Sequence, residues 1–512
     1  MIQKPEFDVA IVGYGPVGAI AACWLGQAGV KTLVIDKTRT IWDIPRAMAL
    51  DHEILRVFQN LGVIDRVLEH TAPFGVSEHF GASGQLIRCI DVVPPPHPLG
   101  YLPNMVFTQP PVESILRQRA QDHPSVSTEL GVKLIALHSD HECVTLRVLD
   151  EAGYTGTRTA AYVIGCDGAS STVRHLLGIP LNDLGFDEPW LVVDLIVNND
   201  AIVKLPMASA QYCDPERPCT YIIGPANHRR WEIMLNPGEE PRQMEQEQNV
   251  WRLLSRWVEP TDGKLWRASS YRFHALVADA WRRGRIFLAG DAAHQQPPFI
   301  GQGMCQGVRD VTNLCWKLMS VLRRECPDSL LDTYCEERKQ HVITLTGRIK
   351  EIGAAICERN PEAARRRDED LLARGGGKAL LVTRQEIVPP LQSGLIYAES
   401  KGAGTIFPQP WLLTANGSKH MDEIVGSGWR LFVDGRGFSQ QSTPVNFVFP
   451  PIILGGEGHQ EIDGVTAAWF DRQGAKAAIV RPDHYVYCTV TELGSLDEVC
   501  RRLKNRIVFA NS

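Results

Sequence analysis

The chain has 512 residues, of which 44% are hydrophobic and 22% charged, and its formal net charge is -6. These values are typical of a globular protein with room for about two to four domains, and they give no electrostatic support for nucleic-acid binding or an anionic membrane partner. The N-terminus lacks a signal-type segment, so we expect a cytoplasmic location. The 13 cysteines form no CxxC pair and no zinc-type Cys/His cluster, so neither a disulfide framework nor a metal site is predicted.

The N-terminal segment carries the first motif. An apolar run, Phe7–Val12, is followed by Gly13-x-Gly15-x-x-Gly18, a helix-like stretch and a second apolar run that ends at Asp36. Gly13 permits a tight turn, Gly15 lets backbone amides approach a pyrophosphate, and Gly18 lets the helix pack on the strand. Asp36 can accept a ribose hydroxyl. The pattern predicts a dinucleotide site but does not distinguish FAD from NAD.

Residues 37–185 alternate between helical and strand patterns. A loop that includes Arg46 precedes a helix predicted from Asp51 to Leu61, and Gln109 begins a second helix that extends to Arg119. Three strands are predicted at Lys133–Leu137, Val144–Leu149 and Arg158–Ile164. The last strand runs into Cys166-Asp167-Gly168, a second strand–turn–helix junction that carries an acid.

The middle of the chain predicts a sheet and then a third junction. Two-residue alternation between Trp190 and Phe273 indicates an antiparallel sheet with one side covered. A strand from Arg285 to Ala289 leads into Gly290-Asp291 and into a loop with Pro298 and Gly301-Gln302-Gly303, where a long helix begins. A second helix is predicted from Ser329, a good N-cap, to Cys357.

The region after residue 400 reads as a separate small α/β domain. Its predicted strands are Trp429–Val433, Ala467–Phe470, Ala477–Val480 and Tyr485–Val490, with a helix near Leu496–Leu503. Cys488 and Cys500 do not form a CxxC motif, so packing or oligomerisation is expected here rather than redox activity. A homodimer is possible.

The three junctions together resemble those of the single-component flavin aromatic hydroxylases of the para-hydroxybenzoate hydroxylase type. The chain is most similar to the branch that contains phenol hydroxylase and 3-(3-hydroxyphenyl)propionate hydroxylase, and the resemblance covers nearly the whole chain. Further segments that carry it are Arg46-Ala47, Asp51-His52-Glu53, Asn313-Leu314-Cys315-Trp316-Lys317-Leu318 and Arg481-Pro482-Asp483.

The resemblance implies an α/β fold in which a Rossmann-like FAD-binding domain is joined to an antiparallel-sheet substrate domain and a C-terminal thioredoxin-like domain. The FAD-binding domain would comprise residues 1–75, 105–185 and 275–345, and the substrate domain residues 76–104 and 186–274. Residues 346–400 would form a helical connector, and residues 401–512 the thioredoxin-like domain.

The resemblance also assigns roles to individual residues. Gly13, Gly15 and Gly18 would hold the FAD pyrophosphate, and Asp36 the adenosine ribose. Other cofactor-binding roles fall to Arg46, Gln109, Asp167, Gly168, Gly290 and Asp291. Pro298, Gly301, Gln302 and Gly303 would form the loop against the flavin ring, where helix N-terminal amides favour a developing negative charge. For His294 in the same region, loop hydrogen bonding is the expected role.

The activity implied is hydroxylation of a phenol ortho to its OH, with FAD as cofactor, NADH or NADPH as co-substrate, and dioxygen. A meta-substituted phenol such as 3-(3-hydroxyphenyl)propionate is the expected substrate, giving a catechol. Tyr212, Tyr221, His228 and Tyr271 are candidates for the phenol-deprotonating base, but packing is the more usual role of such residues and none is chosen. Arg217, Arg229, Arg230 and Arg272 are candidates for binding a carboxylate, with solvated surface as the more usual role of each. The alternatives are a flavin oxygenase acting on a polyketide-like aromatic by hydroxylation, epoxidation or Baeyer–Villiger chemistry, and a non-catalytic binding protein with this fold.

Overall fold

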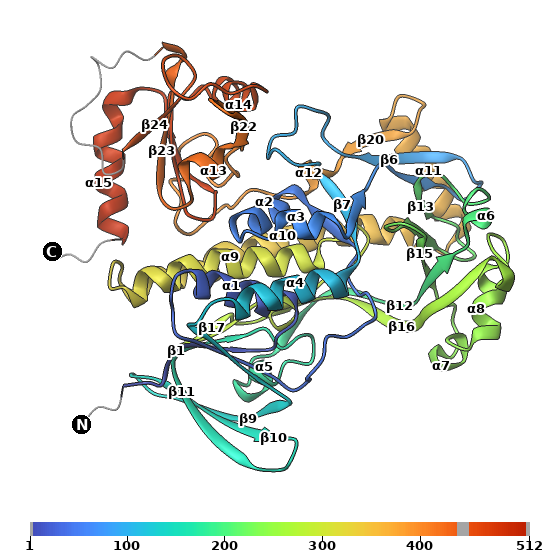
Figure 1. The fold of residues 1–512 in the computed structure, drawn as a ribbon. Coiled ribbons are helices and arrows are strands. Elements are labelled where there is room, and N and C mark those ends of the chain that lie inside the picture. The colour runs from blue at the N-terminus through green and yellow to red at the C-terminus, as the bar shows by residue number, and fades with distance from the viewer. Residues whose placement is uncertain (1–3, 438–449, 508–512) are drawn as a thin grey trace.

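The computed structural model describes residues 4–437 and 450–507, which form two large sheets with their helices and a smaller C-terminal domain (Figure 1). The predicted N-terminal unit is present as strand β1 (Phe7–Val12), helix α1 (Pro16–Gln27) and strand β2 (Thr32–Asp36). Strand β1 pairs in parallel with β2 and with β11 (Thr155–Gly165). The observed fold is therefore the Rossmann-like arrangement that the sequence predicts.

The first large sheet, sheet A, contains eight strands. The order β17-β18-β11-β1-β2-β8 forms its main path, and β10 and β9 extend from β11 as an antiparallel ribbon. The remaining strands are β8 (Val126–Leu130), β9 (Val132–Ser139), β10 (Val144–Asp150), β17 (Arg282–Arg283) and β18 (Ile286–Leu288). Helices α1, α4 (Gln109–Gln121) and α9 (Gly303–Leu322) lie together in Figure 1 and share one apolar core with this sheet.

Shorter elements complete this region. A three-stranded sheet consists of β3 (Ala49–Asp51), β7 (Asn104–Phe107) and β4 (Thr71–Pro73). Helices α2 (His52–Asn60) and α3 (Ile64–Leu68) accompany it, whereas α5 (Thr172–Leu176) lies against β9 of sheet A. Asp51 caps α2 by accepting hydrogen bonds from the amides of Glu53 and Ile54, which explains why the helix begins there.

The second large sheet, sheet C, has nine strands in the order β19-β16-β12-β15-β14-β13-β5-β6-β20. Its strands are β5 (Ser77–Phe80), β6 (Leu86–Asp91), β12 (Leu181–Val197), β13 (Ser209–Tyr212), β14 (Cys219–Ile223), β15 (His228–Met234), β16 (Gly263–Ala278), β19 (His294–Gln295) and β20 (Leu380–Thr383). Helices α6 (Asn199–Ile202), α7 (Pro241–Met244) and α8 (Glu247–Leu254) accompany it.

The expectation that this sheet has one covered side is wrong. Every residue of β15 is buried, including the polar residues that alternate with Trp231 and Ile233. Trp231 and Ile233 pack with residues of α7 and α8 on one face. The other face packs against Phe299 and Ile300, so the sheet lies between two layers and its polar side chains are enclosed rather than solvated.

The segment after α9 differs from the prediction in two places. The second long helix, α10, spans Asp332–Ile356, and Ser329 lies in a preceding 3-10 turn instead of acting as its N-cap. Residues 361–387 form α11 (Pro361–Arg374), strand β20 and α12 (Arg384–Ile387). Strand β20 pairs with β6, so the segment predicted as a helical connector also contributes an edge strand to sheet C.

The C-terminal domain is built on the four-stranded sheet β24-β23-β25-β26. Its elements are β21 (Trp411–Thr414), β22 (Gly417–His420), α13 (Met421–Val425), β23 (Arg430–Asp434), β24 (Pro451–Leu454), α14 (Val465–Gln473), β25 (Ala477–Val480), β26 (Val486–Val490) and α15 (Leu496–Ile507). The strand predicted at Ala467–Phe470 is wrong because these residues lie inside α14, between Gly464 and Gly474. A short apolar run does not distinguish a buried strand from a buried helix face.

Buried ion pairs join this domain to the rest of the molecule. Arg56 of α2 pairs with Asp422 at 2.7 Å, and Arg481 pairs with Glu337 of α10 at 2.7 Å. Burial raises the pKa of Cys488 to about 12, which disfavours the reactive thiolate. Within residues 4–437 and 450–507, no helix is both long and apolar enough to cross a membrane.

Candidate functional site

The three positions of the N-terminal turn require glycine for different structural reasons. Gly13 has a φ of 101°, and a Cβ there would lie 2.4 Å from the carbonyl oxygen of Cys166. A Cβ on Gly18 would lie 2.0 Å from the carbonyl oxygen of Gly13. Packing therefore requires both glycines. Gly15 caps α1, and a Cβ there would meet no atom within 4 Å. Internal packing therefore does not require glycine at this position, and the missing side chain leaves the helix N-terminus open to an anionic group.

Asp36 lies beside this turn at the end of β2. Its carboxylate accepts a hydrogen bond from the Tyr14 amide at 2.6 Å and another from the Thr38 amide at 2.7 Å. The first contact ties Asp36 to the glycine-rich turn. The strand, turn and acid thus meet in space as a dinucleotide site requires.

Arg46 and Gln109, which are distant in sequence, are brought together. The Gln109 side-chain oxygen accepts hydrogen bonds from the amides of Arg46 at 3.2 Å and Ala47 at 2.8 Å. From sheet C, Arg230 donates to the carbonyl oxygens of Arg46 at 2.8 Å and Pro45 at 3.0 Å. The loop that carries the exposed Arg46 side chain is therefore held by two separate elements.

Asp291 lies in a turn that a residue of α9 fixes. The buried Asp310 carboxylate accepts hydrogen bonds from the Gly290 amide at 3.0 Å, from His294 Nε2 at 2.7 Å and from Arg338 Nε at 2.9 Å. The predicted hydrogen-bonding role of His294 is confirmed by this contact. Asp291 is accessible to solvent, yet surrounding protein raises its pKa, as expected for a carboxyl group in a concave site.

Sequence reasoning missed Asp310. The available signal was the adjacent pair Arg309-Asp310 in a helix with an apolar stripe, because charges at buried helix positions need partners. Burial alone would raise the pKa of Asp310, but His294 and Arg338 outweigh it and lower the pKa. Asp310 is therefore the anion that orders the Gly290-Asp291 turn.

Asp167 and Gly168 form the junction beside Gly13. The Asp167 carboxylate accepts hydrogen bonds from the Ser171 hydroxyl at 2.5 Å and the Val173 amide at 3.0 Å. Gly168 has a φ of 80° and a Cβ there would meet no atom within 4 Å. The carboxylate of Asp167 thus orders the start of α5, so its contribution to a cofactor site would be to position the turn.

The loop Pro298–Gly303 leads into the N-terminus of α9. The Gly301 amide donates to the Pro298 carbonyl oxygen at 2.7 Å, and a Cβ on Gly301 would lie 2.6 Å from that of Ala49. The Gln302 side-chain oxygen accepts from Arg309 at 2.9 Å. Gly303, the first residue of the helix, has open space around its missing Cβ. The loop thus exposes backbone at a helix N-terminus, as an anionic ring edge requires.

Glu232 of β15 lies on the sheet face that packs against this loop. It lies opposite Val192 in the antiparallel β12–β15 pair, and opposite residues share a face. Val192 packs with Phe299 and Ile300. The ring centroid of Trp190, two residues from Val192 on β12, lies 5.6 Å from that of Phe299. The face that carries Glu232 therefore lies against the loop predicted to contact the flavin.

Glu232 is buried without a close partner. Its Oε1 atom lies 4.0 Å from Arg230 Nη1, and its carboxylate forms no hydrogen bond with any residue that the structure describes. Burial raises the pKa of Glu232 to about 7, although Arg230 opposes the increase. A carboxyl group with this pKa is suited to proton transfer near neutral pH. The signal that sequence reasoning missed was the alternation of side chains along β15, which places Glu232 on the face opposite to that of Trp231.

The tyrosine candidates divide between the two faces. Tyr221 lies opposite Trp231, and Tyr212 packs in the same outer cluster, so both face away from the loop. Tyr271 lies opposite Trp190 on the inner face but is 42% exposed. His228 is buried on the inner face, where Nε2 contacts Asp194 at 2.7 Å. Tyr212 and Tyr221 are therefore unsuitable as bases.

The four predicted carboxylate-binding arginines already have partners. Arg217 forms two hydrogen bonds with Glu239, and Arg272 two with Asp187. Arg230 pairs with Asp194 at 2.7 Å. Arg229 donates to the carbonyl oxygens of Ala226 and His228. The expectation that these side chains are available for a substrate carboxylate is not supported by this geometry.

Comparison with known proteins agrees with the geometry. A model of the FAD binding domain family matches residues 6–348. A probable NADH-specific resorcinol 4-hydroxylase from Rhodococcus jostii (strain RHA1) is 34% identical, with 98% of this chain and 95% of that protein covered. A 3-(3-hydroxy-phenyl)propionate/3-hydroxycinnamic acid hydroxylase from Burkholderia cenocepacia (strain HI2424) is also 34% identical, with 94% of each covered.

Solved structures show the same fold. An aklavinone-11 hydroxylase in a ternary complex with FAD and aklavinone superposes with a TM-score of 0.79 at 23% identity, covering 99% of this chain and 100% of that one. A flavin-dependent monooxygenase in complex with FAD and substrate gives a TM-score of 0.80 at 21% identity, covering 98% of this chain and 100% of that one.

Proposed function

Because the chain belongs to the family of FAD-dependent aromatic hydroxylases, we propose that it hydroxylates a meta-substituted phenol ortho to its OH, giving a catechol-type product. NAD(P)H and dioxygen are the co-substrates. The observation that carries the proposal is the position of Glu232, a buried carboxyl group on the sheet face that packs against the loop Pro298–Gly303. A phenol between them could lose its proton to the sheet while its ring faces the flavin.

The cofactor-binding roles proposed for individual residues rest on the accessible backbone and acids. The N-terminus of α1 at Gly15 would receive the pyrophosphate, and Asp36 the adenosine ribose. Asp291 would accept hydrogen bonds from ribityl hydroxyls, and Arg46 would approach the phosphates. The amides at Gly303 would stabilise negative charge on the ring. When bound, FAD accepts hydride from NAD(P)H and transfers one oxygen atom of dioxygen.

The protein's own contribution to the reaction is proton transfer and orientation. The ionised form of Glu232 would take the phenol proton, because the phenolate oxygen directs electron density to the ortho carbon that is attacked. Arg230, held by Asp194, would keep the Arg46 loop in place while lying 4.0 Å from Glu232. The packed aromatic residues of the inner face, such as Trp190 and Phe299, would exclude water.

The proposal must also specify whether the substrate carries a carboxylate, because one relative is named for resorcinol, a neutral phenol, and another for a phenol with a carboxylate side chain. Arg384 is a candidate for the carboxylate. It is buried, donates to the Ile300 carbonyl oxygen at 2.7 Å, and forms no ion pair among the described residues. Burial lowers the pKa of Arg384 to about 10. These features favour a carboxylate-bearing phenol over resorcinol.

The test combines reduction, product analysis and one variant. NADH and NADPH are each mixed anaerobically with the flavoprotein, with and without 3-(3-hydroxyphenyl)propionate or resorcinol, and the products made under 18O2 are identified by mass. We expect flavin reduction without a partner reductase and one labelled oxygen in the product. Arg384→Met should raise KM for the carboxylate substrate and leave that for resorcinol unchanged. A colourless protein, or failure to hydroxylate either phenol, would overturn the proposal.

The division into domains stays a proposal. The predicted FAD-binding segments 1–75, 105–185 and 275–345 contain all strands of sheet A. The placement of β20 in sheet C supports assigning part of the segment 346–400 to the substrate domain. A homodimer and a cytoplasmic location are likewise proposals, which sedimentation and cell fractionation would test.

A further inference from the structure

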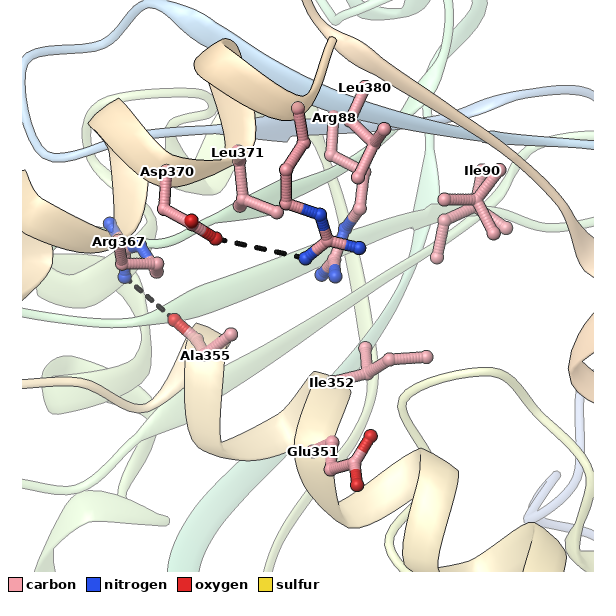
Figure 2. Close-up of a pocket in the computed structure, with 11 residues that line it drawn as sticks. Arg88, Ile90, Glu351, Ile352, Ala355, Arg367, Asp370, Leu371 and Leu380 are labelled. Carbon is pink, nitrogen blue, oxygen red and sulfur yellow. Dashed lines mark hydrogen bonds and ion pairs between the residues drawn. The ribbon is translucent and has the colours of Figure 1, made fainter.

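A cavity outside the proposed cofactor site lies between sheet C and helices α10 and α11 (Figure 2). Its volume is about 320 Å³, at the lower end of the range for small-molecule sites. Apolar side chains from four elements line it, among them Ile90 of β6, Ile352 of α10, Leu371 of α11 and Leu380 of β20. The guanidinium group of Arg88, from β6, points into the space between these elements in Figure 2.

Arg88 is a buried cation without a counterion. Arg88 is 7% exposed, and it forms no ion pair with a carboxylate among the described residues. The hydrogen-bond partner of Arg88 is Nδ1 of His79, at 2.9 Å, and its own Nε atom has no partner. Burial and the adjacent Arg88 hold the pKa of His79 well below its usual range, so His79 is neutral and cannot balance the charge.

The other charged groups around the cavity do not compensate for Arg88. Arg367 is already bound to a carboxylate and to two backbone carbonyl oxygens. Arg374 pairs with Asp370 at 3.7 Å at the exposed rim, and Glu351 is also exposed. Three arginines and two carboxylates therefore line the cavity. Since Arg367 and Arg374 already have carboxylate partners, Arg88 is the lining cation that one negative charge would pair, whereas a dianion would meet repulsion from Glu351 and Asp370.

We propose that this cavity binds a small organic monocarboxylate, whose charged end contacts Arg88 and whose apolar body packs against Ile90, Ile352 and Leu371. Arginine presents N–H groups in a planar fork that matches a carboxylate, and an ion pair is strongest where the cation is already withdrawn from water. The apolar walls favour an aryl or alkyl chain over an inorganic anion. The site is separate from the proposed hydroxylation site, and the proposal does not depend on it.

Calorimetric titration of the flavoprotein with 3-phenylpropionate tests the proposal without any turnover, because this probe has no phenol OH and no NAD(P)H is added. Every protein titrated, the parent included, carries Arg384→Met, so that the carboxylate position proposed for the substrate does not contribute to binding. Arg88→Met removes the charge and keeps much of the volume. Leu380→Trp narrows the cavity from a half-buried edge-strand position and keeps Arg88. Arg365→Met is the matched control, since Arg365 lies exposed on the same helix as Leu371 and does not line the cavity.

We expect 3-phenylpropionate to bind the parent and Arg365→Met equally, and to bind Arg88→Met and Leu380→Trp at least about 10-fold more weakly, as the loss of a charged hydrogen bond implies. 3-Phenylpropan-1-ol should bind the parent at least about 10-fold more weakly than the acid. Equal affinity of Arg88→Met and the parent, or absence of parent binding up to about 10 mM, would overturn the proposal. If Arg88→Met does not fold, Leu380→Trp decides in the same way. Neither result alters the test of hydroxylation.

Discussion

Glu232→Gln is the change that most directly tests the proposed chemistry. Glutamine keeps the shape of the side chain and removes both its charge and its ability to accept a proton. In the parent, catalytic proton removal requires the ionised carboxylate, so hydroxylation should increase with pH around the pKa of about 7 and then level off. The variant should lose this dependence and form product roughly 100-fold or more slowly, as expected for loss of a general base.

The same substitution has a thermodynamic consequence that does not involve a substrate. Burial raises the pKa of Glu232 from 4.5 to about 7 in the folded protein, so the folded state holds this proton more tightly than the unfolded state. The associated stability is fully present below about pH 4.5 and is lost as pH rises through about 7. An increase of this size corresponds to roughly 3 kcal/mol. Above pH 7, the variant should therefore be more stable than the parent by up to that amount.

Urea unfolding of both proteins with saturating FAD, at about pH 5 and about pH 8.5, measures this effect. The free energy of unfolding of the parent should fall relative to that of Glu232→Gln between the two pH values. An identical pH dependence in both proteins would show that Glu232 is not a buried carboxyl group with a raised pKa, and the argument for its role as base would be refuted.

Three further predictions concern the proposed cofactor site and the turn that Asp310 orders. Gly15→Val should weaken FAD binding while the protein still folds, whereas Gly18→Val should impair folding, because only the second side chain would collide with backbone; flavin content and circular dichroism distinguish the two. Asp291→Ala should weaken FAD binding by about 1–3 kcal/mol, measured by fluorescence titration, and unchanged affinity would contradict its assignment to the ribityl chain. Asp310→Ala should destabilise the protein by about 3–5 kcal/mol, since it leaves Arg338 buried without its carboxylate; a melting temperature equal to the parent's would contradict this.

The sequence specifies the fold best where local pattern and tertiary structure agree. Strand β1, the glycine turn and β2 follow one another within a single unit, and the predicted β25 has the observed bounds, Ala477–Val480. The strand predicted at Ala467–Phe470 was wrong because a run of four residues is too short to show the periodicity that would identify a helix. Ser329 was misassigned because a 3-10 turn precedes α10 and takes the place of a capped start.

The site was predictable where a motif fixes the backbone and unpredictable where a side chain depends on distant partners. Gly13 is dictated by its own positive φ and by the nearby Cys166 carbonyl. By contrast, the environment of Glu232 depends on Val192 and on the loop at Phe299, which are remote in sequence. The arginines of the middle sheet show the same limit, since Arg230 meets Asp194 only through strand pairing.

Arg230 shows why the substrate sheet and the cofactor loop are best regarded as one functional unit. Its guanidinium group pairs with Asp194 at 2.7 Å, donates to the carbonyl oxygens of Pro45 and Arg46, and lies 4.0 Å from Glu232. Burial raises the pKa of Asp194, but Arg230 and His228 outweigh it and lower the value to about 2, so Asp194 stays ionised and Arg230 keeps its partner. Arg230 therefore holds the loop by hydrogen bonds, and its charge lowers the pKa of the carboxyl group proposed as base. Any displacement of the Arg46 loop that moved Arg230 would also change the pKa of Glu232, which would couple the proposed cofactor loop to the proposed deprotonation of the phenol.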